Sequence, residues 1–170
     1  GTGNNNNSFI NNNITAVQYG IYSQGASAAN KNTGTVINQN QINTNASMKG
    51  GIWVGFDDGV TISGNNIGNI LQASSPDVFA ITCGFGTSIT ATTSTGNEVT
   101  NATITKNVIG SVANTGTFSA YGIGVSAATS GTTLIANNMI SGVVANGTAG
   151  DFATDIALGG GTGSTTNSYY

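Results

Sequence analysis

The fold of this chain is indicated by the segment TISGNNIGNI, residues 61–70. In this segment Ile62 is followed by Asn65 three positions later and by Ile67 two positions after that. The same spacing occurs in four other places, at Phe9-Asn12-Ile14, Ile37-Asn40-Ile42, Ile104-Asn107-Ile109 and Ile135-Asn138-Ile140. A further isoleucine follows each copy, at positions 21, 52, 81, 123 and 156. Short constant cores with spacers of variable length are typical of a solenoid whose loops leave fixed corners.

Stacked coils explain why these residue types recur. Alternate residues of each short strand point inward, and stacking places like residues above one another at ~4.8 Å. The asparagine is expected at a sharp bend, where Asn tolerates left-handed backbone angles and its amide can bond to the Asn above and below. We therefore expect an all-β fold, a right-handed single-stranded parallel β-helix of about five coils with three sheets. The asparagine ladder would consist of Asn12, Asn40, Asn65, Asn107 and Asn138.

The repeat resembles the parallel β-helix repeat of the pectate-lyase-like superfamily, in the form found in bacterial secreted and surface proteins. That superfamily includes polysaccharide lyases, hydrolases, phage tailspikes and surface proteins, so the resemblance implies the fold more than one activity. Its hydrolases use paired carboxylates, and its lyases use Ca²⁺ held by acids beside an Arg or Lys base.

The whole chain, residues 1–170, is expected to form one β-helix segment with a repeat core at about residues 8–158. Residues 159–170 are expected to be a linker or an edge tail. Neither end resembles a polar cap, which solenoids need to remain soluble. We therefore expect the native chain to be longer, or its ends to be covered by a partner or another copy.

The composition excludes several classes of function. Only 5% of the residues are charged, histidine is absent and the net charge is −3, so nucleic acid is not an expected partner. No apolar run approaches ~18 residues, so membrane insertion is not expected. Cys83 is the only cysteine and belongs to an inward column, which predicts a small buried hydrophobic residue. The neutral polar composition favours an extracellular or cell-surface location.

The acidic residues do not form a recognisable catalytic set, and no catalytic residue is assigned. Asp57 and Asp58 precede Gly59 and are interpreted as turn residues, with a weak Ca²⁺ site as the alternative. Asp77 and Asp151 would lie ~10 Å apart along the axis, which is long for joint chemistry. No other cofactor is expected. The remaining acids are Glu98 and Asp155.

Tyr22 and Trp53 each follow an inward isoleucine and are expected to point outward from adjacent coils, ~5 Å apart. An exposed aromatic ledge of this kind is a surface on which sugar rings stack. The alternative is that a long loop, residues 24–34 or 43–49, covers the two rings. By the same alternation Tyr19, Phe79 and Tyr121 are predicted to point inward.

These observations favour an extracellular structural or adhesive module that displays surface loops and contacts a polysaccharide or cell-surface glycan. The first alternative is a fragment of a polysaccharide lyase or glycoside hydrolase. A minor alternative is an ice-binding protein, suggested by Thr61-Ile62-Ser63 and Thr103-Ile104-Thr105. Val36 and Leu134 interrupt that threonine column, whereas ice binding requires a flat repeating face.

Overall fold

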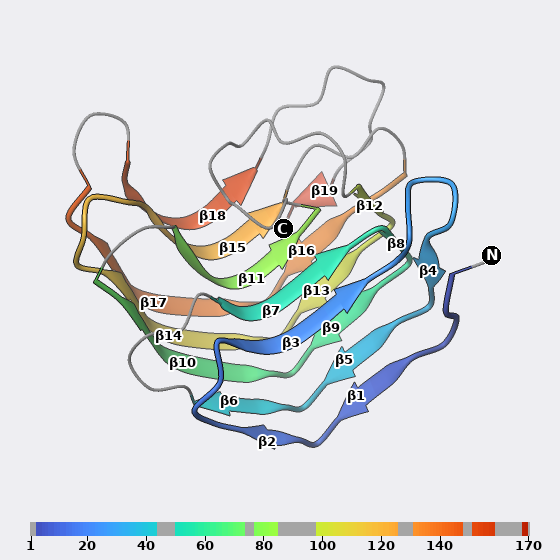
Figure 1. Cartoon of the computed structure of the whole chain (residues 1–170), viewed down its shortest axis with the longest axis horizontal. Helices are drawn as coiled ribbons and strands as arrows, with labels where there is room; N and C mark the ends of the chain where they lie inside the picture. Colours follow the sequence, from blue (N-terminus) through green and yellow to red (C-terminus); the bar gives the residue numbers. More distant parts are fainter. Residues whose placement is uncertain are drawn as a thin grey trace.

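The computed structural model describes residues 3–43, 50–73, 77–84, 98–125, 131–147, 151–158 and 168–169. This part of the chain contains β-strands and no helix. The strands form four sheets, in which every pairing between named strands is parallel. The described residues therefore form an all-β parallel solenoid, whose successive coils lie side by side in Figure 1.

Each coil passes through the sheets in the order I, II, III and, where it is present, IV. Sheet I contains β1 (Ser8–Ile10), β5 (Val36–Asn38), β9 (Thr61–Ser63), β13 (Thr103–Thr105), β16 (Leu134–Ala136) and β19 (Ser168–Tyr169). Sheet II contains β2 (Asn13–Ile14), β6 (Gln41–Asn43), β10 (Asn66–Gln72), β14 (Val108–Asn114) and β17 (Met139–Ala145). Sheet III contains β3 (Tyr19–Gln24), β7 (Gly50–Gly55), β11 (Val78–Cys83), β15 (Ala120–Val125) and β18 (Ala153–Leu158). Sheet IV contains β4 (Asn32–Thr33), β8 (Asp57–Asp58) and β12 (Val99–Thr100).

The isoleucine columns form the core of the solenoid. In sheet I, for example, Ile37 pairs with Ile62 and Ile62 with Ile104 in the register of neighbouring strands. Each fully buried side chain of this size contributes roughly 1.5–3 kcal/mol. The ten isoleucines predicted to point inward are all at most 2% exposed: Ile37, Ile42, Ile52, Ile62, Ile67, Ile81, Ile104, Ile109, Ile123 and Ile135.

The predicted asparagine ladder is present along the described coils. The side-chain amide of Asn12 donates to Oδ1 of Asn40 at 2.9 Å, and Asn40 donates in the same way to Asn65. The ladder continues at 2.9 Å from Asn65 to Asn107 and from Asn107 to Asn138. The backbone N–H of each donor residue also reaches the same Oδ1 of the next at 3.0 Å. The ladder thus joins five coils through side-chain and backbone groups together.

The left-handed turn residue is not the ladder asparagine, so that part of the prediction is wrong. Positive φ angles occur one position earlier, at Asn11 (57°), Gln39 (56°), Gly64 (66°), Lys106 (57°) and Asn137 (56°). The turn is made at this preceding position, whose occupants range from glycine to lysine. The asparagine that follows can then direct its amide into the buried ladder.

Sheet IV was not predicted, because three sheets were expected. Its strands are two residues long and carry Asn-Thr, Asp-Asp and Val-Thr, without the isoleucine that marks the other sheets. It begins where sheet III ends, and its register pairs Asn32 with Asp57 and Asp57 with Val99. Asp57 and Asp58 therefore lie in a strand and not in a turn.

The strands of sheet III interrupt the normal alternation of inward and outward residues. A Cβ built on Gly51 would lie 2.7 Å from Cγ2 of Ile67, a core residue, so position 51 faces inward like Ile52 beside it. A Cβ built on Gly20 would likewise lie against the side chain of Ile42, so position 20 also faces inward. Because two successive positions face inward, the residue before them faces outward.

This interruption corrects the prediction for three aromatic residues. Tyr19, Phe79 and Tyr121 precede the double-inward positions and belong to a second cluster with Trp53 outside the main core. Gly20, Gly51 and Gly122, which precede three of the five isoleucines of sheet III, allow close packing inside the solenoid.

Candidate functional site

The outer side of sheet III carries the aromatic pair of Tyr22 and Trp53. The two residues are in register on β3 and β7, and their rings stack with centroids 4.4 Å apart and planes 4° apart. The adjacent outward placement predicted from the sequence is therefore present. Trp53 is only 1% exposed, whereas Tyr22 is 46% exposed. Only Tyr22 can offer a surface to a ligand.

Tyr22 is held in place on three sides. Its ring lies against Trp53 and meets the edge of the Tyr19 ring at a centroid distance of 5.9 Å. Its hydroxyl donates a 2.7 Å hydrogen bond to Oε1 of Gln24. An exposed aromatic ring that is already ordered loses little side-chain entropy when a ligand binds.

Asp57 is fully buried, on the inner side of sheet IV. Its Oδ2 accepts a 2.6 Å hydrogen bond from the Thr35 hydroxyl, while no hydrogen-bond partner for Oδ1 occurs among the described residues. Burial raises the pKa of Asp57 to about 6. The hydrogen bond from Thr35 opposes this shift, the nearby Asp58 adds to it, and Lys31 opposes it.

We expect the substitution Asp57→Asn to change how stability depends on pH. The folded pKa of about 6 lies above the ordinary aspartate value near 4, so the folded state holds the proton more tightly. This contribution is present below about pH 4 and is lost as the pH rises through 6. Between pH 4 and pH 7 the free energy of unfolding of the unaltered chain should therefore decline, by an amount on the order of 1 kcal/mol that comes from Asp57. Urea unfolding should show that Asp57→Asn removes this decline.

Asp155→Asn, at an exposed carboxyl group, is the control and should keep the decline of the unaltered chain. If Asp57→Asn and the unaltered chain followed parallel pH profiles, the assignment of the proton to Asp57 would be wrong.

Asp58 lies on the opposite side of strand β8 and forms a polar network with the next coil. Its Oδ1 accepts hydrogen bonds from the Thr100 hydroxyl at 2.8 Å and from the Asn101 amide at 2.7 Å. The Lys31 ammonium donates to the same Thr100 hydroxyl at 3.2 Å. Thr100 therefore joins a cation and an anion through two successive hydrogen bonds.

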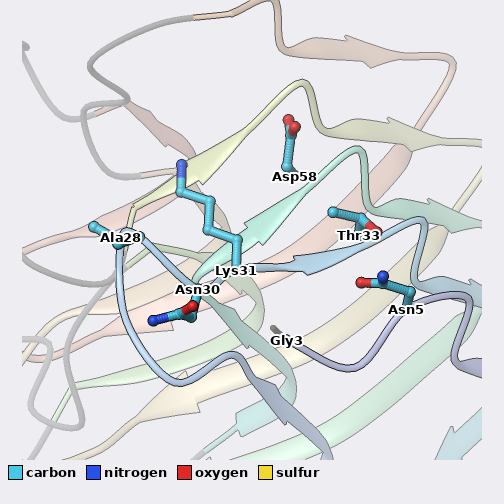
Figure 2. A pocket seen from close by; sticks show the side chains of 8 residues that line it. Gly3, Asn5, Ala28, Asn30, Lys31, Thr33 and Asp58 are labelled. Carbon is cyan, nitrogen blue, oxygen red and sulfur yellow. The ribbon is translucent and has the colours of Figure 1, made fainter. Parts of the chain in front are cut away.

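A pocket of about 300 Å³ opens beside this network. In Figure 2 the Lys31 and Asp58 side chains extend in the same direction from neighbouring coils, with the loop that carries Ala28 and Asn30 beside them. We call this hollow the loop pocket; it is lined by Gly3, Asn5, Ala28, Ala29, Asn30, Lys31, Thr33 and Asp58.

Sequence reasoning singled out only Asp58 among the residues that line the loop pocket. Asn5, Thr33, Asp58 and Thr100 follow one another in register across four coils. The signal in the sequence was the series of dipeptides Asn32-Thr33, Asp57-Asp58 and Val99-Thr100, which lacks any apolar repeat. Lys31 could be placed only once sheet IV was known.

Asp77 and Asp151 are brought together through Ser119. The Ser119 backbone N–H donates to Oδ1 of Asp77 at 2.8 Å, and its hydroxyl donates to Oδ1 of Asp151 at 3.3 Å. Burial raises the pKa of Asp77, the hydrogen bond from Ser119 lowers it, and the nearby Asp151 raises it. Coils two apart thus share one polar cluster at the start of sheet III.

The other candidate residues are placed separately. Cys83 is buried in the core, where burial and then the nearby Asp57 raise the pKa of its thiol. Asp57 and Asp58, on opposite sides of β8, do not converge on one ion, and no cluster of three metal-binding acids, cysteines or histidines occurs in the described ranges. Glu98 lies just before β12, and Asp155 is exposed on β18.

The threonine columns of sheet I are short. Thr61 pairs with Thr103, but Val36 precedes them and Leu134 follows them in the same column. The interruption predicted from the sequence is therefore present.

The fold and its sites define a parallel β solenoid with a polar pocket and an aromatic pair on its outer surface. Searches of protein-family models, of curated proteins and of solved structures found no match to this chain. Within the described residues, no helix has the length and apolar character needed to span a membrane.

Proposed function

We propose that this chain is an extracellular structural and adhesive module that displays loops from a rigid solenoid and contacts glycans. We further propose that it is a parallel β-helix of the pectate-lyase-like type, from a secreted or surface-attached bacterial protein. The ladder and the columns of the repeat support this relationship. The low fraction of charged residues supports the proposed extracellular location.

The observation that carries the proposal is the exposed, ordered ring of Tyr22. Sugar rings present C–H faces that pack on aromatic rings, and an ordered aromatic side chain on a polar surface suits this contact. Trp53 contributes from the neighbouring strand, because its ring stacks on the Tyr22 ring at a centroid distance of 4.4 Å and fixes the plane of that ring. The solenoid supplies the rigid support.

The proposal can be tested by depletion of the full chain from solution with insoluble cellulose, chitin, pectin and peptidoglycan. We expect at least one of these polymers to bind the chain, and Tyr22→Ala to weaken that binding about threefold to tenfold, the loss expected for one aromatic contact. Depletion isotherms give the dissociation constants.

Phe152→Ala is the matched control, because Phe152 is 48% exposed and directly precedes β18, which is three strands away from the β7 strand of Trp53 in sheet III. It should bind like the unaltered chain. The proposed glycan contact would be refuted if no polymer depleted the chain, or if the two substitutions weakened binding equally.

A polysaccharide lyase or hydrolase activity is the second candidate, and the Asp77–Ser119–Asp151 cluster favours it. Two carboxyl groups in one cluster, one with a raised pKa, are the pattern from which an acid and a base are assigned. An activity would appear as new reducing ends or as unsaturated products absorbing in the ultraviolet. Loss of that activity in Asp151→Asn would identify the cluster as its site.

A further inference from the structure

We propose that the loop pocket is a subsite for one uncharged sugar residue, which it binds through a pair of neighbouring hydroxyl groups. This inference rests on the proposed glycan contact and gives it a second, polar part. The chemistry that recognises the ligand is the Lys31 ammonium as donor and the Asp58 carboxylate as acceptor, on one wall of the pocket.

The charges in the loop pocket compensate one another. Lys31 and Asp58 are joined through the Thr100 hydroxyl, by hydrogen bonds of 3.2 Å and 2.8 Å. A ligand that carried a net charge would be attracted by one of the two groups and repelled by the other. An uncharged ligand that both donates and accepts hydrogen bonds meets no such conflict.

Neighbouring hydroxyl groups fit this donor and acceptor pair. Each hydroxyl has one donor and two acceptor positions, so one hydroxyl can accept from the ammonium while the next donates to the carboxylate. Among the described residues, Thr100 and Asn101 both donate to Oδ1 of Asp58, and Oδ2 is the acceptor that we assign to the ligand. Asn5 and Asn30 line the same pocket, and their side-chain amides can both donate and accept.

The walls of the loop pocket are ordered by the backbone. On one side the Asn6 N–H donates to the Thr33 carbonyl at 2.8 Å. On the other side the loop is closed by hydrogen bonds from the Ala26 N–H to the Asn30 carbonyl at 3.1 Å and from the Asn30 N–H to the Ser27 carbonyl at 3.0 Å. A preformed pocket of about 300 Å³ lies at the lower end of the size range of small-ligand sites, which suits one sugar ring.

The experiment uses the full chain and ligand-observed NMR with methyl glycosides of glucose, galactose and mannose as neutral probes. The methyl glycoside of galacturonic acid, whose free carboxylate makes it a charged analogue, and glycine, a zwitterion, are tested beside them. We expect at least one neutral glycoside to bind in the millimolar range, with an affinity that changes less than about twofold between low and high salt.

Two substitutions locate the bound sugar. Asp58→Asn replaces the acceptor oxygen assigned to the ligand with a donor and should weaken binding by about tenfold. Ala29→Trp fills the pocket from an exposed loop position, leaves the Asp58 hydrogen bonds intact and should abolish binding. Asp155→Asn is the control and should bind normally. Melting curves establish that each variant is folded, and Ala29→Trp decides the result if Asp58→Asn does not fold.

The outcomes separate this inference from the proposed function. Binding of the galacturonic acid glycoside or of glycine, without binding of any neutral glycoside, would overturn the inference, as would binding that survives Ala29→Trp. If polymers still deplete the chain through Tyr22 while Ala29→Trp has no effect, the glycan contact stands and the loop pocket is not part of it. Loss of glycoside binding in Ala29→Trp but not in Tyr22→Ala would assign the contact to the loop pocket alone.

Discussion

The substitution Asn65→Ala should destabilise the solenoid by about 3–5 kcal/mol, because it removes four buried hydrogen bonds at once. The Asn65 amide donates to the Ile37 carbonyl at 3.0 Å and to Oδ1 of Asn107 at 2.9 Å. Its Oδ1 accepts from the backbone and side-chain N–H groups of Asn40, at 3.0 Å and 2.9 Å. Alanine leaves these partners in a dry interior without a replacement. Urea unfolding followed by circular dichroism measures the loss.

Asn66→Ala is the matched control, one residue along the chain. The Asn66 amide donates to Oε1 of Gln41 at 3.0 Å, but this bond is on the exposed side of β10. Water can replace it, so the cost should be within about 0.5 kcal/mol. Equal effects of the two substitutions would show that the buried ladder does not stabilise the fold.

The parts of the fold that could be predicted are those in which one residue type recurs for one physical reason. An isoleucine repeats because each coil needs an apolar residue beneath the same residue of the next coil. An asparagine repeats because its amide both donates and accepts along the axis. Both columns were visible as spacings, and the structure places Ile62, Asn65 and Ile67 as the spacing predicted.

The parts that could not be predicted are those in which different residues fill equivalent positions. The left-handed turn before the ladder accepts Gln39, Gly64 and Lys106, because only the backbone angle is required there. Sheet IV is likewise built from residues of mixed polarity. In sheet III the inward position after Tyr19 is Gly20 and the one after Phe79 is Ala80. Neither residue is large enough to indicate the direction of its side chain, so simple alternation placed Tyr19 and Phe79 on the wrong side.

The candidate sites also contain one part that a recurring position predicts and another part that it does not. The outward placement of Tyr22 and Trp53 depends only on the position after an inward isoleucine, and it could be predicted. The burial of Trp53 depends on what packs around its ring, so the burial could not be predicted. The loop pocket depends on sheet IV and on the path of the loop before it, so the sequence offered Asp58 as a candidate without its partner Lys31.

Ile70→Ala should cost about 2–5 kcal/mol, whereas Leu71→Ala, at the adjacent position, should cost less than about 1 kcal/mol. Ile70 is fully buried and pairs with Val112 of the next coil, while Leu71 is 37% exposed on the outer side. Ile67 and Ile70 both point inward although they are three residues apart, which strict alternation forbids. The left-handed residue between them, Asn69 with a φ of 55°, supplies the extra step.

This comparison tests the register of β10 after Asn69, where a slip of one residue would exchange the inward and outward positions of Ile70 and Leu71. Both substitutions shorten one aliphatic side chain on the same strand. Strand propensities differ by at most about 1 kcal/mol, so a larger difference between the two substitutions reports burial. Urea midpoints, measured with the slope of the transition, give the two free energies of unfolding. A larger loss for Leu71→Ala than for Ile70→Ala would mean that β10 is shifted by one residue beyond Asn69.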